Sequence, residues 1–380
     1  MTEKYKWFAS TPIGIEDIGA QEINEITGCS TTIEMGKIFF EGPLDAMYLL
    51  NYYARTINRV YLSLARGVFN DLRDIYHEAK SIDYTTIIPA ESTFAVRCER
   101  AGSHEFTSLD VARVVGQAVI DSYYEATGRR LKVNLETPDV EIHVFIRDND
   151  FLIGVNTTGE ALHKRKYRVF DHPAALKTTL AAAMLRIAGY NGEPLLDPLC
   201  GGGTIVIEAA HKSRKTPIFL FRKEYLFSKL KIHDSLLEDL VKKKLLSEMN
   251  RDLYEITCMD ISVKSIEGAR RNAESALVLD TIKFKIGDAA RIESYTGVEA
   301  ELIVTNPPYG IRSHNLKKIE GFYKDLLKTW RDRYPGIKAV VITASTKQFE
   351  NAVLATNVEI KSTRFVMHGG LPARIYLVKT

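Results

Sequence analysis

The sequence predicts an α/β protein with a mostly parallel C-terminal sheet, preceded by an N-terminal α+β region. Beyond residue 173, short apolar runs alternate strictly with helical segments, a pattern typical of a parallel sheet with helices on both faces. The first of these runs ends in a glycine-rich turn at residues 197–204 and leads directly into a helix, as in nucleotide-binding α/β domains. Before residue 157, alternating strand patterns flank amphipathic helices, which indicates smaller α+β units.

Length, charge and cysteine content limit the possible functions. A chain of 380 residues is longer than one that ordinarily folds around a single hydrophobic core, so we expect more than one domain. The net charge is only +3, so any affinity for nucleic acid must come from local basic patches. The sequence has no run long enough to span a membrane and no metal-ligand spacing, so we expect a cytoplasmic monomer without a metal. We also expect all four cysteines to be reduced thiols: Cys29, Cys98, Cys200 and Cys258.

The N-terminal part is predicted to contain two small α+β units. In the first, we predict strands at 6–10, 37–41 and 60–66 and helices at 14–27, 43–56 and 70–82. In the second, strands at 93–100, 141–147 and 150–156 accompany a long helix at 108–127. The second unit carries a set of basic residues: Arg97, Arg100, Arg113, Arg129, Arg130 and Lys132.

The C-terminal part is predicted to alternate between strands and helices. After the strand that precedes the glycine-rich turn, we predict strands at 256–260, 282–288, 301–306, 338–344, 359–368 and 374–379. Helices are predicted at 176–188, 262–277, 320–333 and 347–356, and the last two strands form an edge hairpin. Residues 211–255 are too long for a simple connection, so we interpret them as an insertion with a helix at 235–249. A solvated helix face is favoured there over an RNA contact.

The densest basic run in the chain, residues 162–168, joins the two parts. It contains four cations, Lys164, Arg165, Lys166 and Arg168. Such a run is commonly a solvated linker, but its position between a basic unit and a catalytic domain slightly favours contact with RNA phosphates.

Four predicted strands end in polar residues that could form one site. These residues are Asp197, Asp260, Asp288 and Asn306. Because the carboxyl ends of parallel strands meet at one edge of a sheet, we expect them to line a common crevice. One aspartate alone would be interpreted as a helix cap, but four at successive strand ends favour a ligand site.

The ligand predicted for this crevice is S-adenosylmethionine. A dinucleotide is disfavoured because the turn lacks the G-x-G-x-x-G spacing, and because Asp197 would repel a pyrophosphate but attract a sulfonium cation. We expect Asp260 to accept hydrogen bonds from the ribose hydroxyls, and Asp288 to meet the adenine amino group with the backbone of Ala289. The remaining predicted cofactor contacts are Cys200, Gly201, Gly203, Thr204, Ile261 and Asn306.

The motifs at 197–204 and 306–309 together resemble the paired signatures of class I S-adenosylmethionine-dependent amino-methyltransferases. Flanking segments at 158–168 and at 172–177 with 180–185 resemble the THUMP-domain RNA guanine-N2 methyltransferases, most closely the archaeal tRNA enzymes that modify guanine 6. The resemblance implies a Rossmann-like domain with a seven-stranded sheet and a C-terminal antiparallel hairpin, preceded by a THUMP domain. The three-glycine turn departs from the commoner Gly-Ser-Gly.

This resemblance implies four regions and a mechanism. We expect a ferredoxin-like unit at 1–65, an RNA-binding THUMP domain at 66–160, a basic linker at 161–175 and the methyltransferase domain at 176–380. The Asn306 side-chain oxygen and the Pro307 carbonyl would accept the N–H groups of a guanine amine, Pro308 would stiffen the loop, and Tyr309 would stack on the flipped base.

The predicted reaction is N2-methylation of a guanosine in tRNA, at position 6 of the acceptor stem. Three alternatives stay open. They are methylation of a ribosomal RNA guanine, N6-methylation of adenine in DNA, and an RNA-binding protein with an inactive methyltransferase fold. The THUMP-like half argues against DNA, and the intact polar residues at the strand ends argue against an inactive fold.

Overall fold

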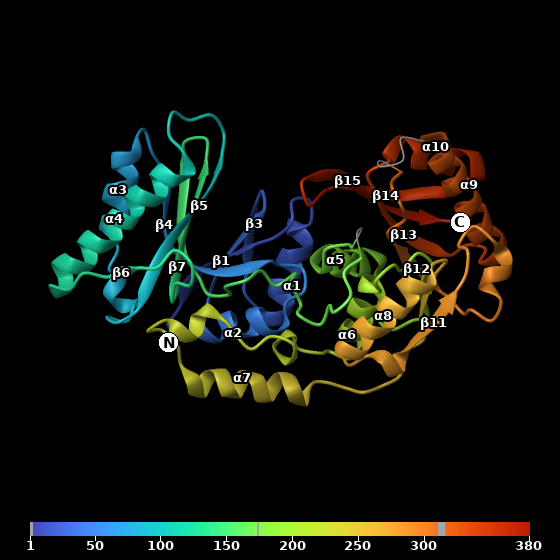
Figure 1. Ribbon diagram of the computed structural model, residues 1–380, viewed down its shortest axis with the longest axis horizontal. Coiled ribbons are helices and arrows are strands. Elements are labelled where there is room, and N and C mark those ends of the chain that lie inside the picture. The colour runs from blue at the N-terminus through green and yellow to red at the C-terminus, as the bar shows by residue number, and fades with distance from the viewer. Residues whose placement is uncertain (1–2, 173–174, 311–315) are drawn as a thin grey trace.

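The strands of the protein form two sheets, described here from a computed structural model that covers residues 3–172, 175–310 and 316–380 (Figure 1). The N-terminal sheet has eight strands in the order β2-β3-β1-β4-β8-β7-β5-β6, and the C-terminal sheet has seven in the order β11-β10-β9-β12-β13-β15-β14. Pro173 and Ala174, within one of the flanking segments quoted above, lie outside the described residues. The predicted α/β class, with an α+β region before a mostly parallel sheet, is confirmed.

The N-terminal sheet joins strands of both predicted α+β units. Its strands are β1 (Tyr5–Ser10), β2 (Thr31–Glu34), β3 (Lys37–Gly42), β4 (Arg59–Val68), β5 (Thr93–Ala101), β6 (Lys132–Val133), β7 (Val140–Arg147) and β8 (Asp150–Asn156). The helices are α1 (Glu16–Thr27), α2 (Leu44–Tyr53), α3 (Leu72–Lys80) and α4 (Ser108–Thr127). Strand β4 pairs with β1 on one side and β8 on the other, so the predicted boundary between residues 65 and 66 falls within it.

Side chains alternate between the two faces of this sheet, and one face carries the main N-terminal core. Trp7, Val60 and Leu62 belong to that core, together with residues of the four helices. Their neighbours in sequence, Phe8 and Tyr61, belong to a small separate cluster on the opposite face. Figure 1 shows α3 and α4 lying together on one side of β4, β5 and β7.

The C-terminal sheet has the predicted order of alternating strands and helices. Its strands are β9 (Leu195–Asp197), β10 (Ile256–Asp260), β11 (Ile282–Ile286), β12 (Leu302–Thr305), β13 (Lys338–Thr343), β14 (Glu359–His368) and β15 (Leu371–Lys379). The helices are α5 (Thr178–Ala188), α6 (Thr204–Ser213), α8 (Val263–Ser275), α9 (Leu316–Arg333) and α10 (Thr346–Thr356). Strands β9 to β13 are parallel, and β15 runs antiparallel to both β13 and β14, as the predicted hairpin requires.

This sheet is buried on both faces. Leu195 and Val340 pack with residues of α5, α6 and α8, whereas Leu196 and Val341 pack with residues of α9 and α10. Since successive residues of a strand face opposite sides, both layers need apolar side chains. The uninterrupted apolar runs seen in the sequence follow from this arrangement.

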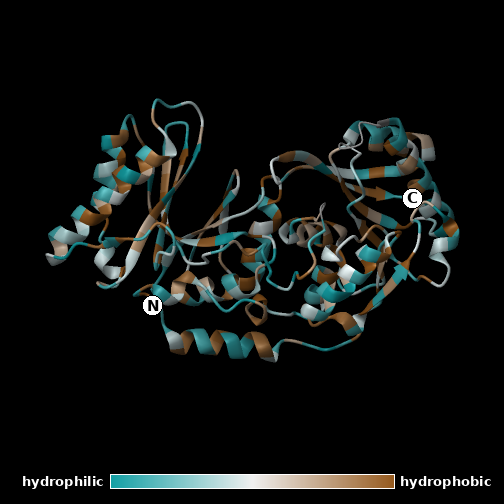
Figure 2. Ribbon diagram, in the orientation of Figure 1, coloured by the Kyte–Doolittle hydropathy of each residue, from teal (hydrophilic) through white to brown (hydrophobic). Residues whose placement is uncertain are grey.

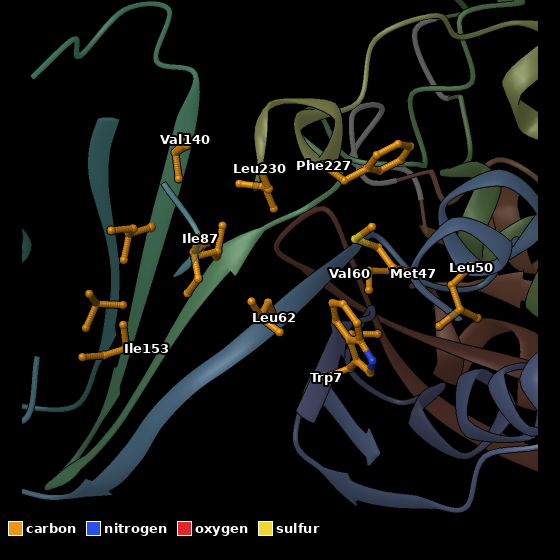
Figure 3. Packing of buried hydrophobic residues seen from close by; sticks show 14 of the residues in the cluster. Trp7, Met47, Leu50, Val60, Leu62, Ile87, Val140, Ile153, Phe227 and Leu230 are labelled. Atoms are coloured by element: carbon orange, nitrogen blue, oxygen red, sulfur yellow. The ribbon is translucent and has the colours of Figure 1, made fainter. Parts of the chain in front are cut away.

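The insertion between α6 and β10 packs against the N-terminal part. Its helix α7 (Ser235–Ser247) lies beside α2, and its residues alternate between hydrophilic and hydrophobic along the helix (Figures 1 and 2). The Tyr48 hydroxyl of α2 lies 3.2 Å from His233 Nδ1 and donates to the Asp234 carbonyl. Phe227 and Leu230 enter the N-terminal core, as Figure 3 shows. The insertion therefore links the two parts of the molecule.

A buried charge cluster also joins the two parts, and we call Arg55, Arg165, Tyr167 and Glu208 the Glu208 cluster. Arg165 Nε lies 3.2 Å and Arg55 Nη1 3.5 Å from the Glu208 carboxylate, and the Tyr167 hydroxyl donates to it. Burial would raise the pKa of Glu208, but the two guanidinium groups outweigh that effect and lower it. Arg55 follows α2, Arg165 lies in the basic run and Glu208 lies on α6, so the cluster fixes three segments together.

Candidate active site

The tips of β9 and β12, which carry the two motifs, are adjacent in the structure. Leu195 pairs with Ile256 of β10 on one side and with Leu302 of β12 on the other. The Thr305 hydroxyl at the end of β12 donates to Asp197 Oδ1 at the end of β9, at 2.7 Å. The chain passes from β9 outward through β10 to β11 and then crosses back to β12 on the other side of β9, so the strand order reverses at β9, which is the position where open α/β sheets bind ligands.

The glycine-rich turn needs glycine for both conformation and space. Gly201 and Gly203 have φ values of +50° and +79°, a region that residues with a Cβ adopt at a cost. A Cβ on Gly203 would also lie 3.1 Å from the Ala269 Cβ of α8. The Gly201 N–H donates to Asp260 Oδ2 at 3.0 Å, so the turn is fastened to the end of β10.

Asp197 lies beneath the turn and is 1% exposed. Its carboxylate accepts hydrogen bonds from Thr305 and from the Leu199 N–H. Burial raises the pKa of Asp197 to about 7, and these two hydrogen bonds only partly oppose the shift. Asp197 thus braces the two strand tips, and its predicted electrostatic role toward a sulfonium stays a prediction.

Residues of the linker cover the turn from the other side. The Arg168 guanidinium donates to Thr204 Oγ1 at 3.0 Å and to the Leu176 carbonyl at 3.2 Å. Asn272 of α8 accepts from the Phe170 N–H and donates to the Gly202 carbonyl. Sequence reasoning missed Asn272, because a single asparagine within a helical pattern gives no signal of such a bridge.

Two expectations about individual residues are wrong. Cys200 and Cys258, predicted to be reduced, form a disulfide with a Cα–Cα distance of 5.6 Å, because the β9 turn lies against neighbouring β10. The Cys200 side chain is therefore engaged with β10, and its contact with a cofactor stays a prediction. Arg165 is 2% exposed within the Glu208 cluster, so it cannot contact RNA phosphates.

The rest of the basic run has a mixed placement. Lys164 and Lys166 are exposed, and both pair with the carboxylate of Glu160. Arg168 is half-buried against the turn. Contact with RNA stays a prediction for these three residues.

The strand ends offer groups that fit S-adenosylmethionine. Asp260 is half-buried, and Ile261 beside it is 64% exposed although apolar, so the pair offers acceptors for ribose hydroxyls next to an apolar surface for an adenine ring. Asp288 Oδ1 accepts from the Ala290 N–H at 3.0 Å, and the Ala289 carbonyl accepts from the Tyr295 hydroxyl at 2.7 Å. The predicted contacts of Asp288 and Ala289 with adenine remain untested.

The loop at residues 306–309 is held in place from several sides. The Tyr309 hydroxyl donates to Asn306 Oδ1 at 2.8 Å, and burial raises the pKa of Tyr309, so the phenol stays protonated. The Tyr323 hydroxyl of α9 donates to the Pro308 carbonyl at 2.8 Å. Ser345 donates to the Tyr309 carbonyl. Tyr323 and Ser345 were missed because they come from segments distant in sequence.

His368, at the end of β14, is a further neighbour of this loop that sequence reasoning did not select. Its Nδ1 lies 3.5 Å from the Tyr309 hydroxyl, with the two rings edge to face. Burial, with a smaller contribution from the charge of Lys177, lowers the pKa of His368. A neutral imidazole therefore faces Tyr309 at pH 7.

The described segments contain neither a candidate metal site nor a helix that could span a membrane. Within residues 3–172, 175–310 and 316–380, histidine, cysteine and acidic side chains form no group that could hold a metal ion. In the same segments, every helix is too short or too polar for a membrane span.

Comparisons with known families cover the whole arrangement. Residues 165–374 match the family described as RMKL-like, methyltransferase domain. Residues 69–156 match the THUMP domain, and residues 6–61 match the RlmL ferredoxin-like domain. The first match spans the basic run from Arg165 onward, the glycine-rich turn, the loop at 306–309 and the start of β15.

Two relatives and one solved structure agree with these matches. The tRNA (guanine(6)-N2)-methyltransferase of Methanocaldococcus jannaschii is 39% identical over 378 residues, which cover 97% of this chain and 98% of the relative. The enzyme of the same name from Archaeoglobus fulgidus is 40% identical over 376 residues, which cover 97% and 91%. SMU.472, whose structure was solved with SAH, shares the fold at a TM-score of 0.87 and 21% identity, over 99% of this chain and 98% of its own. The chain therefore belongs to the RMKL-like methyltransferases with a THUMP domain, and it is an S-adenosylmethionine-dependent RNA methyltransferase.

Proposed function

We propose that this enzyme methylates the exocyclic N2 of a guanosine in tRNA, at position 6 of the acceptor stem. The observation that carries the proposal is the direct adjacency of β9 and β12, because it places the glycine-rich turn beside the loop at 306–309. Two relatives that match nearly the whole chain are named for this reaction, which supports the choice of base and position.

In the proposed site, Asn306 and Pro307 accept the two N–H groups of the guanine amine. The amine is a poor nucleophile because its lone pair is delocalised into the ring. An acceptor pair that holds both hydrogens out of the ring plane directs the lone pair toward the methyl donor. S-adenosylmethionine supplies an electrophilic methyl group on its sulfonium.

The hydrogen bond between Tyr309 and Asn306 is compatible with this role. An amide oxygen has two lone pairs, so Asn306 Oδ1 can accept from the Tyr309 hydroxyl and from the substrate amine together. The phenol then fixes the orientation of the amide while the ring contacts the flipped base. Since Tyr323 and Ser345 hold the loop backbone, its acceptors need little reorganisation.

The fit of the cofactor to the strand ends extends the proposal. Asp260 would hold the ribose, Ile261 would cover the adenine, and the turn at 201–204 would contact the methionine part through its backbone. Lys164 and Lys166 would contact the RNA backbone, with Arg168 holding Thr204 from the linker side.

The test uses radiolabelled S-adenosylmethionine with three transcripts: a tRNA with guanosine at position 6, the same tRNA with adenosine there, and ribosomal RNA. Label in N2-methylguanosine after nucleoside digestion, present only with the first transcript, is expected. Label in ribosomal RNA alone would show that the substrate is ribosomal RNA and not tRNA. Label in the adenosine-6 transcript would place the target elsewhere in the tRNA.

A further inference from the structure

The eight-stranded sheet has a face, here called the bare face, whose buried cluster includes no residue of a described helix. Its centre is formed by Phe8 and Tyr61, which stack with ring centroids 4.6 Å apart. Phe39 of β3 and Phe145 of β7 flank this pair and are only half-buried. The cluster is too small to be a second core, and its outer rings reach the surface.

Cations lie over both outer rings. Lys37 Nζ is 3.8 Å from the centroid of the Phe145 ring, and Arg66 Cζ is 4.7 Å from that of Phe39. The Arg66 side chain is 57% exposed and also pairs with Glu34. Each charged group lies at the end of a flexible side chain, so it can move away from the ring without movement of the backbone.

Two grooves share a wall at the bare face, and the larger one also includes Trp7, Cys29 and Phe40 of the core on the opposite face. One groove has a volume of about 390 Å³ and the other of about 770 Å³, and Phe39 and Arg66 line both. The basic residues that line the grooves are Lys4, Lys6, Lys37, Arg66, Arg100 and Arg147, against four carboxylates. The surface thus combines half-buried aromatic rings with an excess of positive charge.

We propose that the bare face binds a single-stranded segment of the RNA substrate, with bases stacked on Phe39 and Phe145. This inference rests on the proposed function only in that the substrate is RNA. On binding, a base replaces each cation on its ring, and Lys37 and Arg66 turn to the neighbouring phosphates. Base stacking on aromatic side chains beside a basic groove is how proteins hold single strands with little sequence preference.

A duplex does not fit this chemistry as well. Bases inside an A-form helix are stacked on one another, so their faces are not available to Phe39 or Phe145. A protein strand would add to an edge of the sheet, at β2 or β6, where backbone groups are unpaired, and not to its face.

The experiment measures binding of a fluorescein-labelled oligouridine of about ten nucleotides to the full chain by fluorescence anisotropy. The variants are Phe39→Leu, Phe145→Leu and Lys37→Gln. The matched controls are Tyr124→Leu, which changes an aromatic residue on α4 that is 57% exposed, and Lys283→Gln on β11 of the other sheet, whose side chain is 66% exposed. Circular dichroism melting confirms that each variant is folded.

Each phenylalanine substitution is expected to weaken binding by at least about fivefold. Lys37→Gln is expected to weaken binding and to lower the slope of log affinity against log salt by about 0.7, the value for one phosphate contact on a single strand. The two controls should bind within about twofold of wild type, since exposed substitutions of this kind cost little. A blunt RNA duplex should compete poorly.

Three results would overturn the inference: equal binding by wild type and all three variants, no binding of oligouridine by wild type, or equal competition by the duplex. Methylation assays separate this inference from the proposed function. If tRNA guanosine is methylated with the same kcat/KM by all variants, only the bare-face inference fails. If no tRNA guanosine is methylated but the phenylalanine variants lose oligouridine affinity, only the proposed function fails.

Discussion

The two sheets of this protein differ in what covers them, and the difference decides where each can bind a ligand. The seven-stranded sheet has helices on both faces, so its polar groups gather at the carboxyl ends of β9, β10 and β12. The eight-stranded sheet packs its helices against one face and leaves half-buried aromatic rings and cations on the other. A sheet with helices on both faces leaves only its strand ends accessible to a ligand. A sheet with helices on one face also leaves its other face accessible.

The largest effect should come from the end of the covered sheet. Asn306→Ala removes an acceptor for the substrate amine, and we expect kcat to fall by about 10³-fold or more, as for other preorganised polar groups. Affinity for oligouridine should stay within about twofold because it depends on other residues, and affinity for S-adenosylmethionine should change little because Asn306 is only one of several predicted contacts. Tyr309→Phe keeps the amide and should cost only about tenfold, the value of one hydrogen bond. Loss of oligouridine binding in Asn306→Ala would contradict the separation of the two sheets' roles.

The junction between the sheets can be broken at Glu208. Glu208→Gln leaves the guanidinium groups of Arg55 and Arg165 buried without a carboxylate, and we expect a loss of about 3 kcal/mol or more in the free energy of unfolding. Urea unfolding measures this loss. Glu160→Gln, at the partner of the exposed Lys164 and Lys166, is the control and should change stability by less than about 1 kcal/mol. Equal effects of the two substitutions would show that the junction depends on apolar packing instead.

Asp197 should give the covered sheet a pH-dependent stability. Its pKa is raised to about 7 in the folded protein, against an ordinary value of 3.8. Between these values the folded state holds a proton that the unfolded chain has lost, so this contribution to stability falls as pH rises. Relative to Asp197→Asn, wild type should lose about 3 kcal/mol between about pH 5 and pH 7.5 in urea unfolding. Parallel pH profiles for the two proteins would show that this carboxylate titrates normally.

A smaller effect is expected at Asp260, which tests the cofactor side of the same sheet end. Asp260→Asn weakens the predicted hydrogen bonds to the ribose and the bond to the Gly201 N–H, so affinity for S-adenosylmethionine should fall by about 10- to 100-fold. Isothermal titration calorimetry measures the affinity. The control is Asp280→Asn. Asp280 follows α8 and pairs with Arg214, and its substitution should leave the affinity for S-adenosylmethionine unchanged. An unchanged affinity in Asp260→Asn would remove this residue from the cofactor site.

The sequence predicted local elements far better than contacts between distant ones. Helix α4 and strands β8 and β10 have the predicted boundaries, because their patterns and caps are local. Strand β2 was missed since it is a mostly exposed edge strand and has no apolar alternation. The joining of both α+β units in one sheet was also not predicted, because the pairing of β4 with β8 connects residues far apart in the chain.

The same limit applies to the site. The adjacency of β9 and β12 follows from the order of parallel strands and could be expected, whereas the two errors depended on partners that no local pattern reveals. Arg165 pairs with a glutamate 43 residues away, and Cys200 with a cysteine 58 residues away. A charged or reactive residue is thus safely assigned to the surface only when its distant neighbours are known.

The Glu208 cluster has a consequence for substrate choice. Its ion pairs hold the linker against both halves of the molecule, and the insertion that contains α7 makes a second contact between them through α2. If RNA contacts both the bare face and the loop at 306–309 as proposed, the distance between these two sites is set by the protein. The distance between the two sites would then select which nucleotide reaches the loop. Moving the target guanosine along the strand should abolish methylation although the base itself is unchanged.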